Sequence, residues 1–245
     1  MAMRGFFWMM GLVLTVFPAL AHGQARPSVK TPAFAPVLIE LYTAETCPYC
    51  PPADELLASL TNLPGIIGIA CHVDYMGEGR LGLTRPFCRQ RQQAYIAQKT
   101  ASRVYTPMMI VNGRYEAIGY KGPDVSAALV KARGDLVGRI EIAKGEGLMF
   151  HYTLPAIATQ GAPATLWMML FDKPHYGLAR PSVNEGKPVA YVNAAGLYQI
   201  LGPWDGTAQT KSQALMIGGV RKGVVIAAQD EASGKILALG TYYFD

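Results

Sequence analysis

Apolar residues in the first half of the chain occur in short runs that alternate with helix-like stretches. Residues 37–42 and 66–73 are apolar almost throughout, which is typical of strands buried on both faces. Between them, residues 51–62 carry one apolar stripe at helical spacing. We expect strands at 37–42, 66–73, 108–111 and 115–118, and helices at 51–62, 86–101 and 124–132. This order, β-α-β-α-β-β-α, predicts a right-handed βαβ unit followed by a hairpin and a last helix.

Two local signals support these expectations. Asn112-Gly113 separates two apolar runs, and this dipeptide is a strong signal for a hairpin turn. Asp124 stands where the last helix of this half should begin, so we expect it to cap the N-terminus of that helix.

The second half of the chain, from about residue 136, shows no sustained helical period. Its short apolar runs are separated by Gly, Pro and Asp, at the spacing of an antiparallel sandwich or barrel. We expect strands at 139–142, 148–154, 165–171, 189–192, 197–201, 214–217, 223–228 and 236–243. The sequence therefore predicts an α/β domain over residues 37–135 and an all-β, antiparallel sandwich-like domain over residues 136–245.

The first 21 residues have the pattern of a secretory signal peptide. Arg4 precedes an apolar run, and a small-residue exit ends at Ala21. The unbroken run is about 12 residues long, short of the ~20 that span a bilayer, which argues against a membrane anchor. Residues 22–36 are rich in proline and read as an extended leader. We expect cleavage after Ala21 and a periplasmic or secreted protein.

Composition narrows the class of protein. Of the 245 residues, 51% are hydrophobic and 16% are charged, which excludes an intrinsically disordered chain. Four cysteines are too few for a disulfide scaffold. The net charge of +5 comes without a recognised binding motif, so we expect no nucleic-acid partner. Beyond the signal peptide, no stretch is long and apolar enough to predict a membrane span.

The strongest chemical signal is Cys47-Pro48-Tyr49-Cys50, which stands between a predicted buried strand and the start of a helix. Backbone N–H groups and the helix dipole stabilise a thiolate there, so Cys47 is the expected nucleophile. Cys50, one turn later, is expected to resolve a mixed disulfide. Two alternatives stay open. The pair is a structural disulfide, or it binds a metal, although no second C-x-x-C or H-x₃₋₅-H pair completes such a site.

Thr106-Pro107 stands directly before a predicted strand. Cis peptide bonds are essentially confined to proline. A cis bond here would present the Thr106 backbone to a bound peptide and pack Pro107 against the cysteine pair. The alternative is a trans proline at the first residue of an edge strand.

These motifs, in this order, resemble the thioredoxin superfamily over about residues 37–133, and Pro48-Tyr49 is similar to the dipeptide of glutaredoxins. A closer resemblance is to an exported bacterial thioredoxin-like family known as a domain of unknown function (number twelve twenty-three). The similar segments are Glu40-Leu41-Tyr42-Thr43, Cys50-Pro51-Pro52-Ala53-Asp54, His72-Val73-Asp74-Tyr75, Arg91-Gln92 with Tyr95, Val104-Tyr105-Thr106-Pro107, Tyr191-Val192-Asn193 and Leu201-Gly202-Pro203-Trp204-Asp205-Gly206. The resemblance implies an α/β thioredoxin-like N-terminal domain, an all-β C-terminal region and an exported location. It supplies no substrate.

His72, Asp74 and Tyr75 follow one another at the end of the second predicted strand. The carboxyl ends of parallel strands share one edge of a sheet, so these residues are expected near Cys47. Alternation along a strand would place His72 and Asp74 on one face and Tyr75 on the other. They are candidates for a proton relay to Cys50 or for orienting the site. The alternative is that they only fasten the end of the strand.

Cys71 and Cys88 remain as the other pair, 17 positions apart. A disulfide between them would hold the intervening loop beside the active edge of the sheet. Two free buried thiols, or a second redox pair that exchanges with Cys47 and Cys50, are the alternatives. Positive charge also gathers around this loop and the next helix, where it would either favour a thiolate and acidic peptides or form a solvated face. The residues are Arg80, Arg85, Arg89, Arg91, Lys99 and Arg103.

The function that fits these signals is an exported thiol–disulfide oxidoreductase with Cys47 and Cys50 as catalytic residues and Thr106 and Pro107 at the substrate. Pro48 removes an N–H that would solvate the thiolate, which argues against an extreme oxidant. We expect protein or small-molecule thiols and disulfides as partners, a monomer, and no cofactor or metal. The direction of electron flow stays open. Two alternatives are a non-catalytic envelope binding module with structural cysteines and a copper- or zinc-binding protein.

Overall fold

The computed structural model describes residues 1, 35–135, 137–159, 163–178, 186–215, 218 and 220–244. The predicted signal peptide, apart from Met1, and the predicted leader up to residue 34 lie outside these described residues. Residues Pro32–Asp245 belong to one compact unit. Within the described ranges, no helix is long and apolar enough to cross a membrane.

Fourteen strands and three helices make up the described part of this unit. In chain order they are β1 (Val37–Thr43), α1 (Pro51–Leu60), β2 (Ile66–His72), α2 (Pro86–Ala97), β3 (Met108–Val111), β4 (Tyr115–Ile118), α3 (Gly122–Arg133), β5 (Gly138–Arg139), β6 (Glu141–Lys144), β7 (Met149–Leu154), β8 (Ala164–Asp172), β9 (His175–Leu178), β10 (Pro188–Tyr191), β11 (Ala195–Trp204), β12 (Gln209–Ala214), β13 (Arg221–Gln229) and β14 (Ile236–Tyr243).

The first sheet has the strand order β2-β1-β3-β4, in which β1 runs parallel to β2 and antiparallel to β3. Every residue of β1 is buried, so the two faces of this strand pack against different layers. Ile39 and Leu41 share a core with residues of α1 and α3. Leu38 and Tyr42 share another core with residues of α2 and of the second sheet. The alternation of side chains along β1 thus assigns one face to each layer.

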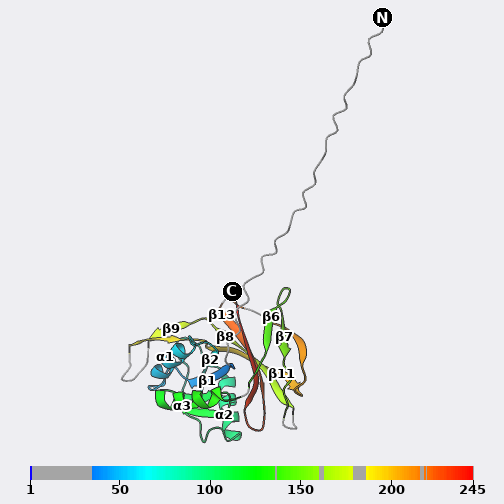
Figure 1. The fold of residues 1–245 in the computed structure, drawn as a ribbon. Coiled ribbons are helices and arrows are strands. Elements are labelled where there is room, and N and C mark those ends of the chain that lie inside the picture. Colours follow the sequence, from blue (N-terminus) through cyan, green and yellow to red (C-terminus); the bar gives the residue numbers. More distant parts are fainter. Residues whose placement is uncertain are drawn as a thin grey trace. The chain divides into compact units, whose positions relative to one another are not determined.

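The second sheet has the order β11-β8-β13-β14-β5, and its central strands β8 and β13 lie beside the first sheet (Figure 1). Trp167 and Met169 of β8 share a core with Leu38 and Tyr42 of β1. The alternating residue Met168 faces a separate core with β6 and β7. Those two strands belong to a third sheet of order β12-β7-β6. The central strands β8 and β13 of the second sheet are therefore covered on both faces.

The predicted fold class is wrong. We expected an α/β thioredoxin-like domain over residues 37–135 and a separate all-β, sandwich-like domain after it. The described part of the chain is mostly β, with fourteen strands in several sheets against three helices. Strands of the second sheet pack, together with α2, on one face of the first sheet. The apolar runs at β8 and β13 are long and buried, but a run of this kind does not reveal which layer it packs against. The proposed domain boundary near residue 135 stays a prediction.

Two strands were not predicted, and one helix cap differs from the expectation. Residues 216 and 217 of the strand expected at 214–217 lie outside the described residues. Strand β12 ends at Ala214, and its residues alternate between half-buried and exposed positions without an apolar run, so the hydrophobic pattern missed it. The hairpin strand β9 was missed as well. Helix α3 begins at Gly122 with Lys121 as its N-cap, so Asp124 lies inside the first turn and is not the cap.

The turn at Asn112-Gly113 joins β3 to β4 and also contacts the second sheet. Both residues have positive φ, 49° and 67°, which is the conformation that this dipeptide favours in hairpins. Asn112 accepts a hydrogen bond from the backbone of Leu38 through its side chain and another from Ile236 N through its carbonyl, at 2.9 and 3.0 Å. A Cβ on Gly113 would meet the carbonyl oxygen of Gly234, so only glycine fits here.

Buried charges link the first sheet to the second. Arg91 of α2 donates through Nε and Nη2 to the two carboxylate oxygens of Glu40, at the centre of β1. Its Nη2 also lies 3.2 Å from Gln229 Oε1 of β13, and its guanidinium carbon lies 4.0 Å from the ring centroid of Trp167. Burial opposes the charge on Arg91, but the Glu40 carboxylate more than offsets this, and the pKa of the guanidinium is raised. The guanidinium of Arg91 therefore stays charged inside the protein.

Candidate functional site

Cys47 and Cys50 form a disulfide between the end of β1 and the start of α1, with their Cα atoms 5.3 Å apart. Cys50 is the N-cap of α1, and its carbonyl accepts hydrogen bonds from the N–H groups of Ala53 and Asp54 at 2.8 and 3.0 Å. Pro51 and Pro52, the first two residues of α1, have no N–H. The first turn of α1 therefore offers a thiolate fewer backbone donors than a helix N-terminus without proline would.

The two sulfur-bearing residues differ sharply in exposure from the residues between them. Cys47 is 2% exposed and Cys50 is fully buried, whereas Tyr49 is 62% exposed. Pro48 is half-buried. In the disulfide form, the aromatic ring of Tyr49 is thus the main part of the motif that a partner molecule can touch.

A buried carboxyl group stands one helical turn after Cys50. Asp54 is 2% exposed, and its Oδ2 accepts a hydrogen bond from Thr43 Oγ1 at 3.2 Å. Its Oδ1 has no hydrogen-bond partner among the described residues. Burial raises the pKa of this carboxyl well above its usual value, and the Thr43 hydrogen bond only partly opposes the shift. Asp54 stands four positions after Cys50, the N-cap of α1, which is about one helical turn.

The sequence did not lead us to predict Asp54 as a site residue, although it lies in one of the segments that carry the family resemblance. The available signal was an acidic residue four positions after Cys50, on the helix face that carries the apolar stripe. Glu55, the next residue, is exposed. A carboxyl group on the buried face of an amphipathic helix is uncommon and marks a position worth testing.

His72 lies at the last position of β2, paired in register with Thr43. It is buried, and neither ring nitrogen has a hydrogen-bond partner within the described part of the chain. Burial, with smaller contributions from Arg85 and His175, lowers its pKa to about 3, so the ring is neutral at pH 7. Its ring meets that of Tyr191 edge-on, with the centroids 5.3 Å apart.

Tyr191 extends this cluster toward the cysteine pair. Burial raises the pKa of its phenol, followed by the nearby charges of Asp54 and Glu45. The structure therefore brings Thr43, Asp54, His72 and Tyr191 together as a set of buried polar side chains beside the start of α1. Tyr191 comes from β10, far along the sequence, and no local pattern pointed to it.

Asp74 and Tyr75 are placed against α2. Because β2 ends at His72, strand alternation does not extend to them. Asp74 lies 3.3 Å from the guanidinium of Arg89, and Tyr75 Oη donates to Gln92 Oε1 at 3.1 Å. These contacts fasten the loop after β2 to α2.

Cys71 and Cys88 are joined by a disulfide, with their Cα atoms 5.3 Å apart and both side chains buried. The bond ties the end of β2 to the first turn of α2. The loop between them also contacts the segment before Cys47, because Thr46 Oγ1 donates to Met76 O at 2.7 Å. The second cysteine pair therefore holds the neighbourhood of the first.

The Thr106–Pro107 peptide bond is cis, and Pro107 O accepts a hydrogen bond from Gly119 N at 2.9 Å. Both residues line a groove of about 500 Å³ that also reaches Tyr49. Tyr120 also lines this groove, and the ring of Tyr49 stacks on that of Tyr120, with the centroids 5.9 Å apart. The residue between the two cysteines and the proline loop thus share one concave surface.

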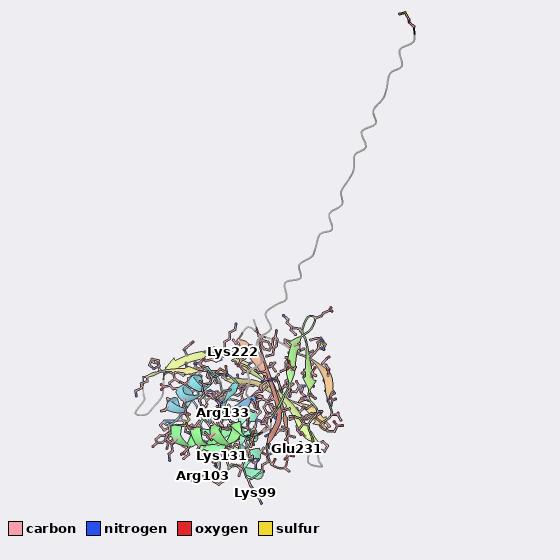
Figure 2. All side chains as sticks on the ribbon, viewed as in Figure 1. Lys99, Arg103, Lys131, Arg133, Lys222 and Glu231 are labelled. Carbon is pink, nitrogen blue, oxygen red and sulfur yellow. A yellow bond between two sulfur atoms is a disulfide. The ribbon has the colours of Figure 1, made fainter. Side chains whose placement is uncertain are left out.

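The basic residues of the first half do not form one solvated face. Arg91 is buried on Glu40, and Arg89 is paired with Asp74. Lys99 and Arg103 follow the end of α2 in the chain, and Figure 2 labels both near the lower edge of the view. Within the described ranges, no three His, Cys, Asp or Glu side chains are grouped as a metal site would require.

Two solved structures are similar to this chain. A crystal structure of a protein from Agrobacterium tumefaciens has 24% sequence identity and a TM-score of 0.66, covering 86% of this chain and 94% of that one. HBP35 of Porphyromonas gingivalis has 18% identity and a TM-score of 0.62, covering 86% of this chain and 76% of that one. At these identities the similarity shows a shared fold alone.

Sequence comparison identifies the family. No curated protein matches the chain significantly. A family model described as "Protein of unknown function (DUF1223)" matches residues 38–229, which contain both cysteine pairs, Asp54 and the proline loop. The chain belongs to the DUF1223 family.

Proposed function

We propose that this protein is an exported thiol–disulfide oxidoreductase that uses Cys47 and Cys50. The observation that carries the proposal is a disulfide across three positions at the start of α1, beside a groove that Tyr49 and the Thr106–Pro107 loop line together. The two disulfides are compatible with an exported protein, since disulfides persist in oxidising compartments. A relationship to the thioredoxin superfamily is part of this proposal and rests on the cysteine and proline motifs.

In the reducing direction, the Cys47 thiolate attacks one sulfur of a substrate disulfide. A mixed disulfide forms, and the other substrate sulfur leaves as a thiolate. The Cys50 thiol then loses its proton, its sulfur attacks Cys47, and the first substrate sulfur leaves as a thiolate. Two electrons pass from the protein dithiol to the substrate, and the Cys47–Cys50 disulfide remains. With a substrate dithiol as the electron donor, the same steps run in reverse.

Asp54 is the group placed to exchange the proton of Cys50. It lies about one helical turn after Cys50, and its Oδ1 has no hydrogen-bond partner among the described residues. Burial raises the pKa of its carboxyl well above the usual value, so Asp54 can hold a proton at a higher pH than an exposed carboxyl can. His72 is neutral at pH 7, and its ring nitrogens have no hydrogen-bond partner in the described part of the chain. We therefore assign it a packing role in the buried cluster and no role in proton transfer.

One observation favours a second candidate function. Cys47 is 2% exposed in the disulfide form, whereas a thiol that meets protein substrates is usually partly accessible. If that burial persists, the pair is structural, and the protein is a binding module in the cell envelope. The two candidates differ in whether Cys47 and Cys50 can be reduced and reoxidised within the folded protein.

A redox titration separates the candidates. The mature protein is equilibrated with defined ratios of reduced and oxidised glutathione, free thiols are alkylated, and each cysteine is quantified by mass spectrometry. We expect Cys47 and Cys50 to become reduced together, while the buried Cys71–Cys88 pair remains oxidised and acts as an internal reference. A Cys50→Ser variant should accumulate mixed disulfides through Cys47, and a Cys47→Ser variant should not. The oxidoreductase proposal is refuted if Cys47 and Cys50 stay oxidised at every accessible ratio.

A further inference from the structure

The size and the lining of the groove beside the cysteine pair indicate which kind of substrate it can bind. Its volume of about 500 Å³ is large enough for one or two peptide side chains. Tyr49 and Tyr120 line it with stacked rings. Arg103 stands before the proline loop, Glu116 on β4 and Asp124 in the first turn of α3.

The two tyrosine rings that line the groove are accessible to a ligand. Tyr49 is 62% exposed and Tyr120 is 42% exposed, although their rings stack on one another. Tyr49 lies between the two cysteines, so a group on its ring is close to the reacting sulfurs. An exposed phenol face attracts a cation through the ring quadrupole and also covers the aliphatic part of a Lys or Arg side chain.

The charged side chains of the groove are mostly acidic. Glu116 and Asp124 are both exposed, and neither belongs to an ion pair recorded among the described residues. Arg103 is the one Lys or Arg among the lining residues in the described chain. The whole chain carries a net charge of +5, so this acidic majority is a local departure from its general character.

Glu116 stands close enough to Tyr105 to affect its titration. Burial raises the pKa of the Tyr105 phenol, and the charge of Glu116 adds to the shift. Tyr105 therefore stays protonated, and its hydroxyl donates to Ala117 O at 3.5 Å. The second carboxylate of the groove, that of Asp124 on α3, lines the same space.

We propose that this groove binds a basic segment of a cysteine-containing protein, with a Lys or Arg side chain over Tyr49 and Tyr120 and near Glu116 and Asp124. The inference rests on the proposed function, because it treats the groove as the place where the substrate lies during thiol exchange. It also chooses between two partner classes. Glutathione carries two carboxylates and one ammonium group, so its net negative charge does not match the groove.

The test compares two peptides of opposite charge. Acetylated and amidated pentapeptides with Lys-Cys-Lys or Glu-Cys-Glu centres are oxidised to their homodimeric disulfides, and each is mixed with the reduced protein. We expect the basic peptide to be reduced about tenfold faster at low ionic strength, from one cation–π contact and one or two exposed charge pairs. The difference should shrink at high salt. Equal rates, or a faster acidic peptide, would overturn the proposal.

Variants assign the effect to the groove. Glu116→Gln with Asp124→Asn should bring the two rates within about twofold of each other, and Arg103→Gln should widen the difference. Glu55→Gln removes an exposed carboxylate from α1, outside the groove, and should leave the ratio of rates unchanged. A ratio that is unaffected by the double variant would refute the assignment of the cation to this groove.

A binding measurement keeps the inference separate from the redox proposal. Peptides with Ser in place of Cys cannot exchange disulfides, and their binding to the oxidised protein is followed by fluorescence anisotropy of an attached dye. Tighter binding of the basic peptide supports the groove assignment even if Cys47 proves unreactive. Conversely, a reducible Cys47–Cys50 pair without preference for the basic peptide leaves the proposed function standing and refutes this inference.

Discussion

Removing the charge of Arg91 is expected to destabilise the whole molecule, because Arg91 connects its first two sheets. Its side chain is 6% exposed, and that of Glu40 is 1% exposed. The guanidinium donates to both carboxylate oxygens of Glu40 and to Tyr95 Oη and Gln229 Oε1, at 3.1 and 3.2 Å. An Arg91→Met variant keeps most of the side-chain volume but leaves the Glu40 carboxylate buried without its cation.

The magnitude follows from that burial. Removing one partner of a buried ion pair costs about 3–5 kcal/mol. In a chain of this length each kcal/mol lowers the melting temperature by about 2–4 °C, so we expect a decrease of about 6–20 °C. Adding Glu40→Gln to Arg91→Met removes the unpaired charge and should recover a large part of the loss. The assay is urea unfolding of the mature, disulfide-intact protein, together with thermal melts followed by circular dichroism.

The control lies on the same helix. Arg89 pairs with Asp74 at 3.3 Å, but its side chain is 45% exposed, so Arg89→Met should cost less than about 1 kcal/mol. Two results would refute the reasoning. One is an Arg91→Met variant as stable as Arg89→Met. The other is a double variant with Glu40→Gln that is no more stable than Arg91→Met alone.

Two further predictions concern the buried cluster beside the cysteines. The pKa of His72 is about 3 in the folded protein against a usual value of 6.5, so the unfolded chain binds more protons between these values. This contribution to stability is fully present above pH 6.5 and is lost as the pH falls toward 3, by up to about 1.4 kcal/mol per pH unit. His72→Leu should flatten that dependence in urea unfolding between pH 4 and 7, and an unchanged slope would contradict the burial argument. Asp54→Asn should slow the release of mixed disulfides by Cys50 roughly 100-fold at pH 7 in quenched-flow assays, with Cys47 alkylation unaffected. Glu55→Gln is the matched control, and equal release rates in both variants would remove Asp54 from the mechanism.

The hydrophobic pattern predicted elements well where burial leaves a periodic or continuous signal. The apolar residues 37–42 correspond to β1, and the run expected at 236–243 is β14. The pattern failed at β12, whose residues alternate between half-buried and exposed positions without an apolar run. It also failed for the fold class. A continuous apolar run indicates that both faces of a strand are covered. It does not indicate whether helices or another sheet cover them.

Residues of the site also differ in whether a short sequence motif or a distant partner determines their role. Cys47, Cys50, Thr106 and Pro107 were predicted to act together because their chemistry is tied to short motifs.

Glu40 illustrates the opposite case, since its partner Arg91 is 51 positions away. Hydropathy treats a charged residue within an apolar strand as a solvent-facing interruption, because burial of a charge is tolerated only when a partner removes most of its cost. Asp54 lies between these cases. Its distance from Cys50 is one helical turn, so sequence alone places it beside that thiol, but its burial depends on β10 and on Thr43 of β1. A site of this kind can be located from a motif, while the protonation behaviour that decides its chemistry depends on strands contributed by the other half of the chain.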